Sequence, residues 1–255
     1  MRFELISTLE KLREVYQVPR GPARFQAYVS AAVGDAQQAE DVALSPLVSA
    51  NPMASENVLA WLETWLSLGA ETLAREVLEE SNTRFEAVPF ARPVKVGLAV
   101  LDDLGGGWTN RAINDAARFQ VGRVLAKTGW VNVNLWTSQA PSPAELRLCV
   151  LEAAHRAAYT VQHGDPVTLA AMLAQEGLIA ASSGRRLTLD ADDLAYSRSI
   201  IAPHLESTHQ PTVLACFYGD DVAREWGYPP LGLSQNAGYE VGLADTLAAQ
   251  VEITR

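Results

Sequence analysis

Residues 131–166 read VNVNLWTSQAPSPAELRLCVLEAAHRAAYTVQHGDP, and this stretch decides the predicted fold. Residues 131–136 alternate apolar and polar side chains, which predicts a β-strand with one buried face. After a short loop rich in serine and proline, helical periodicity runs from about residue 144 to 162. Gly164 and Pro166 then end the helix, because glycine caps helix ends and proline cannot extend them.

A second strand is predicted upstream, at residues 93–101, where valine and leucine dominate. It runs into the turn DDLGGGWTN at residues 102–110. The three glycines lack the lysine and the spacing of a phosphate-binding loop, so we interpret them as a turn that lets the backbone pass close to Trp108. The two strands together predict a small sheet.

The region before these strands has helical periodicity. From Phe3 to about Glu80, apolar residues recur at spacings of three and four. Prolines at positions 19, 22, 46 and 52 interrupt the pattern, because proline cannot continue a helix. About four antiparallel helices fit this region.

Helices are also predicted in the C-terminal part, at about 167–182, from Asp192, around 212–217 and from about Asn236. We see no internal repeat or low-complexity linker. The predicted fold class is therefore α+β and predominantly helical, with a small β-sheet. The change of periodicity separates an N-terminal helical region, 1–87, from a second region, 88–255, and we expect the two to pack as one unit.

The composition limits the partners of the chain. Its 255 residues include 20 Lys and Arg against 30 Asp and Glu, a formal net charge of -10. Such a field repels phosphate backbones and anionic lipids, which argues against nucleic acid and membrane partners. The N-terminus carries charges where a signal peptide needs an apolar run, and no apolar stretch is long enough to span a bilayer. We therefore expect a cytoplasmic protein, with Cys149 and Cys216 reduced and buried.

The segment Leu151-Glu152-Ala153-Ala154-His155 lies in the middle of the long predicted helix. It matches the zinc-peptidase pattern HExxH at the last four positions, and Leu151 replaces the first histidine. In HExxH, two histidines one helical turn apart bind one zinc ion, and the glutamate activates the metal-bound water. The same residues also have structural explanations, because Glu152 can pair with Arg156 at i+4 and His155 can be a buried core histidine.

Two later segments extend the pattern. Ala174-Gln175-Glu176-Gly177-Leu178 lies on the next predicted helix, and Ala237-Gly238-Tyr239-Glu240-Val241-Gly242 lies on the last one. Together with the strand and the helix that carries His155, this succession resembles the gluzincin-like peptidases. The similarity is greatest to bacterial zinc-protease families with a Glu-Gly-Leu segment and a downstream Gly-Tyr-x-x-Gly helix. It covers about Val94 to Leu247 and rests on the order of the segments.

This resemblance implies a zincin-like fold and gives roles to four residues. His155 and Glu176 would be metal ligands, with the Glu176 carboxylate within about 3 to 5 Å of the His155 imidazole. Glu152 would be the catalytic general base, and Tyr239 would steady the oxyanion.

Leu151 departs from the family pattern, because an apolar side chain cannot coordinate zinc. Two ligands then remain, whereas structural zinc takes four protein ligands and catalytic zinc takes three plus water. His163 cannot join His155 at one metal, since it lies about 12 Å further along the helix axis. Spacing supports no substitute among His204, His209, Asp102 and Asp103. Zinc is a possible cofactor, but the ligand count favours an absent or weakly bound ion.

Three hypotheses for the function follow. In the first, the chain is a zincin-like relative of metallopeptidases with an impaired zinc site and a role in binding peptide or protein. In the second, it is an active zinc peptidase whose missing ligand comes from elsewhere in the chain. In the third, it is a helical interaction module, which a large exposed apolar patch within residues 1–80 would favour.

Overall fold

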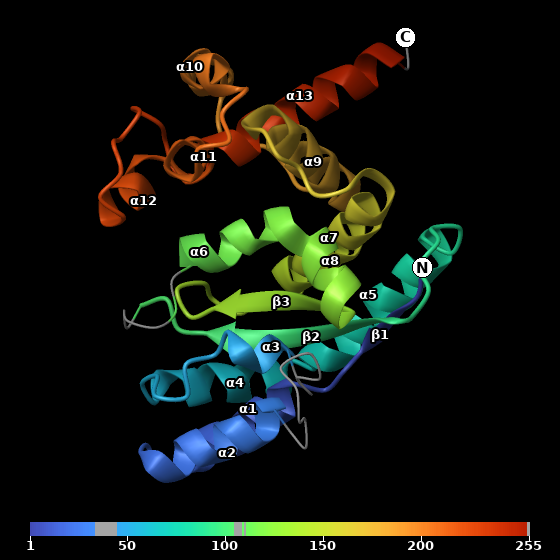
Figure 1. Ribbon diagram of the computed structural model, residues 1–255, viewed down its shortest axis with the longest axis vertical. Helices are drawn as coiled ribbons and strands as arrows, with labels where there is room; N and C mark the ends of the chain where they lie inside the picture. The colour runs from blue at the N-terminus through green and yellow to red at the C-terminus, as the bar shows by residue number, and fades with distance from the viewer. Residues whose placement is uncertain (34–44, 105–108, 110, 254–255) are drawn as a thin grey trace. The chain divides into compact units, whose positions relative to one another are not determined.

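A computed structural model describes residues 1–33, 45–104, 109 and 111–253 (Figure 1). Helices predominate over a three-stranded sheet in this part of the chain, so the predicted mixture of helices with a small sheet is confirmed. The chain forms two compact units. Unit 1 comprises Met1–Asn114 and Val121–His163, and unit 2 comprises Asp115–Gln120 and Gly164–Arg255. The change of periodicity at residue 88 therefore lies within unit 1.

Unit 1 begins with β1 (Phe3–Leu5), α1 (Leu9–Gln17), α2 (Pro22–Val33), α3 (Ser45–Val48), α4 (Asn57–Ser67) and α5 (Ala70–Arg84). It continues with β2 (Val94–Leu101), α7 (Val121–Thr128), β3 (Trp130–Trp136) and α8 (Pro143–His163), while α6 (Arg111–Ala116) crosses from unit 1 into unit 2. Unit 2 contains the 3-10 helices η2 (Ala117–Gln120) and η3 (Ala202–His204), and the helices α9 (Leu169–Ser183), α10 (Ala191–Ile201), α11 (Gln210–Tyr218), α12 (Asp220–Glu225) and α13 (Ala237–Ile253).

The sheet of the described residues is parallel, in the order β1-β2-β3. Parallel neighbours need crossover connections, which α1 to α5 provide between β1 and β2, and α6 to α7 provide between β2 and β3. The central strand β2 is buried from Val96 to Leu101, as expected for a strand covered on both faces. Helices α1, α3 and α4 contact β2, while α7 and α8 contact β3. In Figure 1 the three strands lie side by side through the middle of unit 1.

The N-terminal segment Phe3–Leu5 is a strand, so the prediction that helical structure begins at Phe3 is wrong. One edge of β1 pairs with β2, and Asn82 of α5 binds the other. Asn82 Oδ1 accepts a hydrogen bond from Phe3 N at 2.6 Å, and Asn82 Nδ2 donates to Phe3 O at 3.1 Å. Because both partners are far away in the sequence, the local spacing of apolar residues does not reveal this strand.

Most of the other predicted elements agree with the structure, although the described residues up to Arg84 form five helices where about four were predicted. The strands predicted at 93–101 and 131–136 are present as β2 and β3, and the long helix that follows them is α8. The C-terminal helices are present as α9, α10, α11 and α13. Helices α6 and α7 have no counterpart in the prediction. The glycine-rich turn Gly105–Gly107 and Trp108 lie outside the described residues.

Unit 2 is organised by a close crossing of α9 and α13. A Cβ atom added to Gly177 would lie 2.1 Å from the carbonyl oxygen of Gly242, and one added to Gly242 would lie 2.5 Å from that of Leu173. Gly238 meets the carbonyl oxygen of Cys216, in α11, at 2.8 Å in the same way. A larger residue does not fit unless the backbone moves. The glycines of both motif segments on these helices therefore have a packing role.

Among the described residues, no helix has the length and apolar character needed to cross a membrane. Cys149 and Cys216 are free thiols, and Cys216 is buried. Burial raises the pKa of the Cys216 thiol to about 11, so this thiol stays protonated at neutral pH.

The close helix crossing predicts the effect of a single methyl group. We expect Gly177→Ala to lower the free energy of unfolding by about 3 kcal/mol, because the new Cβ meets rigid backbone. Urea denaturation followed by circular dichroism measures the loss. Ala174→Ser, on the exposed face of the same helix, is the matched control and should cost only about 0.5 kcal/mol. Equal stability of Gly177→Ala and the wild type would show that the two helices are not in this contact.

Candidate functional site

The degenerate motif lies in the middle of α8, in unit 1. Leu151 is partly buried and packs against the apolar core of this unit. Glu152 is partly exposed, and Arg156 is buried one helical turn further on. The helix thus presents the residues in the predicted order, with an apolar side chain at the position of the first histidine.

His155 is a buried histidine that packs against α5. Only 9% of the residue is exposed, and its ring lies edge-on to the Phe85 ring at 4.9 Å between centroids. Its Nε2 atom has no hydrogen-bond partner in the described part of the chain. Burial, with a smaller contribution from the Arg84 guanidinium, lowers the pKa of His155 to about 4. The imidazole is therefore neutral at physiological pH.

Glu176 lies in a polar and aromatic cluster of unit 2. Its carboxylate is buried, with 3% of the side chain exposed, and Oε2 lies 3.6 Å from Arg118 Nη1. Gln175 Nε2 donates a hydrogen bond to Oε1 at 3.3 Å. Arg118 comes from η2, a short segment that the chain contributes to unit 2 before it returns to unit 1. The cation beside Glu176 is thus supplied within this unit.

Tyr239 is a second residue in contact with Arg118. The Arg118 guanidinium carbon is 5.1 Å from the centroid of the Tyr239 ring, a cation–π geometry. The Tyr239 hydroxyl donates to the Tyr218 hydroxyl at 2.9 Å, and the Tyr239 ring packs against Phe217 at 4.9 Å. Arg118 therefore links two residues that the sequence predicted as parts of one site, Glu176 and Tyr239.

The predicted site residues are thus distributed over both units. Glu152 and His155 share α8 in unit 1, while Glu176 and Tyr239 share contacts with Arg118 in unit 2. The predicted approach of Glu176 to His155 joins two different units and stays a prediction. Sequence reasoning missed Arg118, because it lies in an unpredicted 3-10 helix and is distant in sequence from both of its partners.

The alternative metal ligands have other roles. Asp102 and Asp103 tie the ends of β2 and β3 together, since Thr137 Oγ1 donates to Asp102 Oδ1 at 3.0 Å and Ser138 Oγ donates to Asp103 Oδ2 at 2.6 Å. His209 Nδ1 lies 3.1 Å from a threonine hydroxyl in its own helix turn. The His163 ring packs against Tyr159.

A zinc ion does not fit the donor set that the structure describes. Within the described ranges, no three His, Cys, Asp or Glu side chains are grouped so that they could hold a metal ion. His155 offers one unpartnered nitrogen, Leu151 offers no donor, and Glu176 already faces a guanidinium. Neither unit by itself, over its described residues, therefore groups the three protein ligands that catalytic zinc takes.

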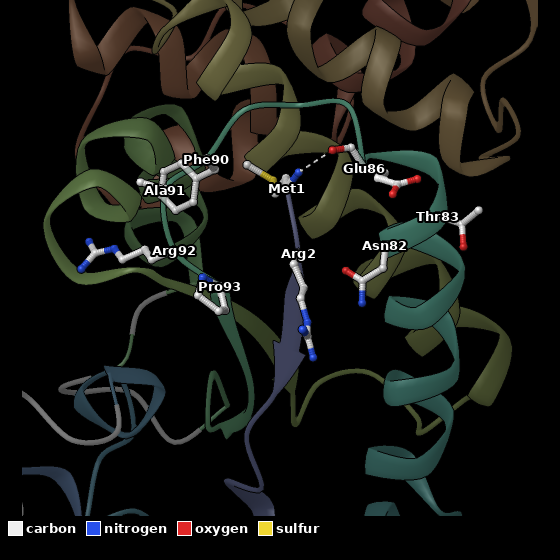
Figure 2. A pocket seen from close by; sticks show the side chains of 9 residues that line it. All are labelled: Met1, Arg2, Asn82, Thr83, Glu86, Phe90, Ala91, Arg92 and Pro93. Atoms are coloured by element: carbon white, nitrogen blue, oxygen red, sulfur yellow. Dashed lines mark hydrogen bonds between the residues drawn. The ribbon is translucent and has the colours of Figure 1, made fainter.

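A surface pocket of about 580 Å³ lies elsewhere in unit 1, where α5 ends and β1 and β2 begin (Figure 2). Its polar groups already serve the fold, because Asn82 binds the edge of β1 and Arg92 donates to carbonyl oxygens at the end of α7. None of the four predicted site residues lines it. The lining residues are Met1, Arg2, Asn82, Thr83, Glu86, Phe90, Ala91, Arg92 and Pro93.

Compared with known protein families, with curated proteins and with solved structures, the chain matches none.

The pKa of His155 predicts part of the pH dependence of stability. Because the folded-state value of about 4 lies below the ordinary 6.5, the unfolded chain binds the proton more readily between these two values. The stabilising contribution is complete above about pH 6.5 and is lost as the pH falls through about 4, with a slope of up to ~1.4 kcal/mol per pH unit.

We expect this component to be absent in His155→Phe, which fills the same apolar site without titrating. Urea denaturation at several values between about pH 4 and pH 7.5 measures the slope. His209→Gln, at an exposed histidine, should keep the wild-type slope. If His155→Phe also keeps it, His155 does not titrate as a buried group.

Proposed function

We propose that the chain is a zincin-like relative of the metallopeptidases that has an impaired zinc site and binds peptide or protein segments. The order of its elements carries this proposal. The edge strand β3 is followed by α8 with Glu152 and His155, by α9 with Glu176 and by α13 with Tyr239. This is the order that the resemblance to gluzincins implies.

The surroundings of the motif support an impaired zinc site. Leu151 belongs to the apolar packing of unit 1, and His155 has a guanidinium nearby that disfavours a second cation. Without a complete zinc site, Glu152 has no metal-bound water to activate. The proposal is therefore one of binding and does not include hydrolysis.

The position of β3 supports the binding of an extended peptide. β3 is the last strand in the order β1-β2-β3, so its outer edge pairs with no strand of the described chain. Extended peptides bind such edges through main-chain hydrogen bonds. On this strand Asn132 and Asn134 are partly exposed, and the buried Asn134 Oδ1 has no hydrogen-bond partner among the described residues. The support for peptide binding is therefore the unpaired outer edge of β3, since the Asn134 oxygen is buried.

The two other hypotheses have less support. An active peptidase needs a third protein ligand, and the described residues supply no such group. An interaction module needs a large apolar surface on the N-terminal helices. The large apolar side chains exposed in the described part of residues 1–80 are Phe25, Val33, Val48 and Leu68.

Zinc content tests the proposed function. We expect the purified protein to contain well under one equivalent of zinc by mass spectrometry, because the motif offers two ligands. Leu151→His should raise the zinc affinity measured by competition with a chromophoric chelator, since it restores the histidine pair at i and i+4. Leu151→Gln is the control for polarity at this position and should not raise it.

Two outcomes would overturn the proposal. Full zinc occupancy in the wild type, lost in both His155→Ala and Glu176→Gln, would identify an intact site and favour the active peptidase. Equal zinc affinity of Leu151→His and Leu151→Gln would show that the remaining ligands are not in gluzincin geometry.

A further inference from the structure

The buried carboxylate of Glu176 needs a positive partner. Its side chain is 3% exposed, and a carboxylate removed from water is strongly destabilised unless it is paired and hydrogen-bonded. In a zinc site the metal ion is that partner. In this chain the Arg118 guanidinium lies 3.6 Å from Oε2, and the Gln175 amide donates a hydrogen bond to the other oxygen.

We propose that Arg118 is the resident cation of the Glu176 site and that it takes the electrostatic role a metal ion would have there. The identification of Glu176 with a former ligand position rests on the proposed function, whereas the charge pair rests on contacts within unit 2 alone. Unit 2 therefore folds around Glu176 without metal.

Tyr239 is the positioning residue for this cation. Its ring faces the guanidinium at 5.1 Å, and its hydroxyl is fixed by Tyr218 at 2.9 Å. The ring is also held between helices, since it packs against Phe217 of α11 while α13 is locked by its glycines against α9 and α11. The aromatic face of Tyr239 thus contacts the guanidinium, while its hydroxyl bonds to Tyr218. This differs from the oxyanion role that the resemblance implies.

A double-mutant cycle tests the pair in buffer containing EDTA. Arg118→Met keeps much of the apolar stem and removes the positive charge that lies 3.6 Å from Glu176 Oε2. We expect the Tm to fall by about 5 °C or more. Arg118→Met combined with Glu176→Gln should recover at least half of that loss, because the neutral amide no longer needs the lost charge as its partner. Arg186→Met, at an exposed arginine of the same unit, is the control and should change the Tm by less than about 1 °C.

The rescue distinguishes a charge pair from simple packing. If Arg118→Met does not fold, recovery of folded protein in the double variant is the same result. Additive losses, or a harmless Arg118→Met, would overturn the proposal. So would a rise of the wild-type Tm with zinc chloride that disappears in Glu176→Gln, since a metal would then be the partner.

The aromatic contact has its own test. Tyr239→Phe keeps the ring and should keep the coupling between Arg118 and Glu176, whereas Tyr239→Leu should reduce it. Equal coupling in both backgrounds would remove Tyr239 from the site. None of these measurements involves Leu151 or His155, so failure here is separable from failure of the proposed function.

Discussion

Parallel pairing of β2 with both of its neighbours is the constraint on which unit 1 depends. Parallel strands cannot be joined by a tight turn, so each connection must cross over a face of the sheet from the end of one strand to the start of the next. The connections consist of helices, and these helices bury β2 on both faces. The outer edge of β1 is satisfied by the side chain of Asn82, and the ends of β2 and β3 are tied by Asp102 and Thr137. These three polar side chains therefore complete the sheet at its edge and at its end.

Unit 2 depends on a different constraint, the contact distance between helices. Glycines let α13 approach both α9 and α11 so closely that a methyl group would meet backbone atoms. Tyr239 of α13 and the buried Glu176 of α9 both contact Arg118. The guanidinium pairs with the Glu176 carboxylate and lies over the Tyr239 ring. Glu240, next to Tyr239, accepts hydrogen bonds from Thr188 and so holds the segment before α10. In the segment 238–242, the two glycines and Tyr239 therefore serve helix packing, and Glu240 serves hydrogen bonding within unit 2.

The chemistry of the two units agrees on one point. His155 is neutral, buried and close to a guanidinium, and Glu176 is paired with another guanidinium. In each unit, therefore, an arginine guanidinium lies near the residue that the sequence predicts as a metal ligand. Under the proposed function, the edge of β3 would bind peptide segments although neither position would hold zinc.

The sequence by itself determined the elements whose signals are local. Local patterns predicted β2, β3, α8 and most C-terminal helices, because the periods of strands and helices appear in neighbouring residues. These patterns are the alternation in residues 131–136, the apolar run before Asp102, and the proline and glycine stops. The candidate residues Glu152, His155, Glu176 and Tyr239 came instead from the order of motif segments that resembles the gluzincins. Only the tertiary structure decided that Phe3–Leu5 is a strand and that Arg118 is the partner of Glu176. Both depend on groups that are distant in sequence. Buried charges and buried backbone groups need partners, and a local sequence pattern does not show which distant group is the partner.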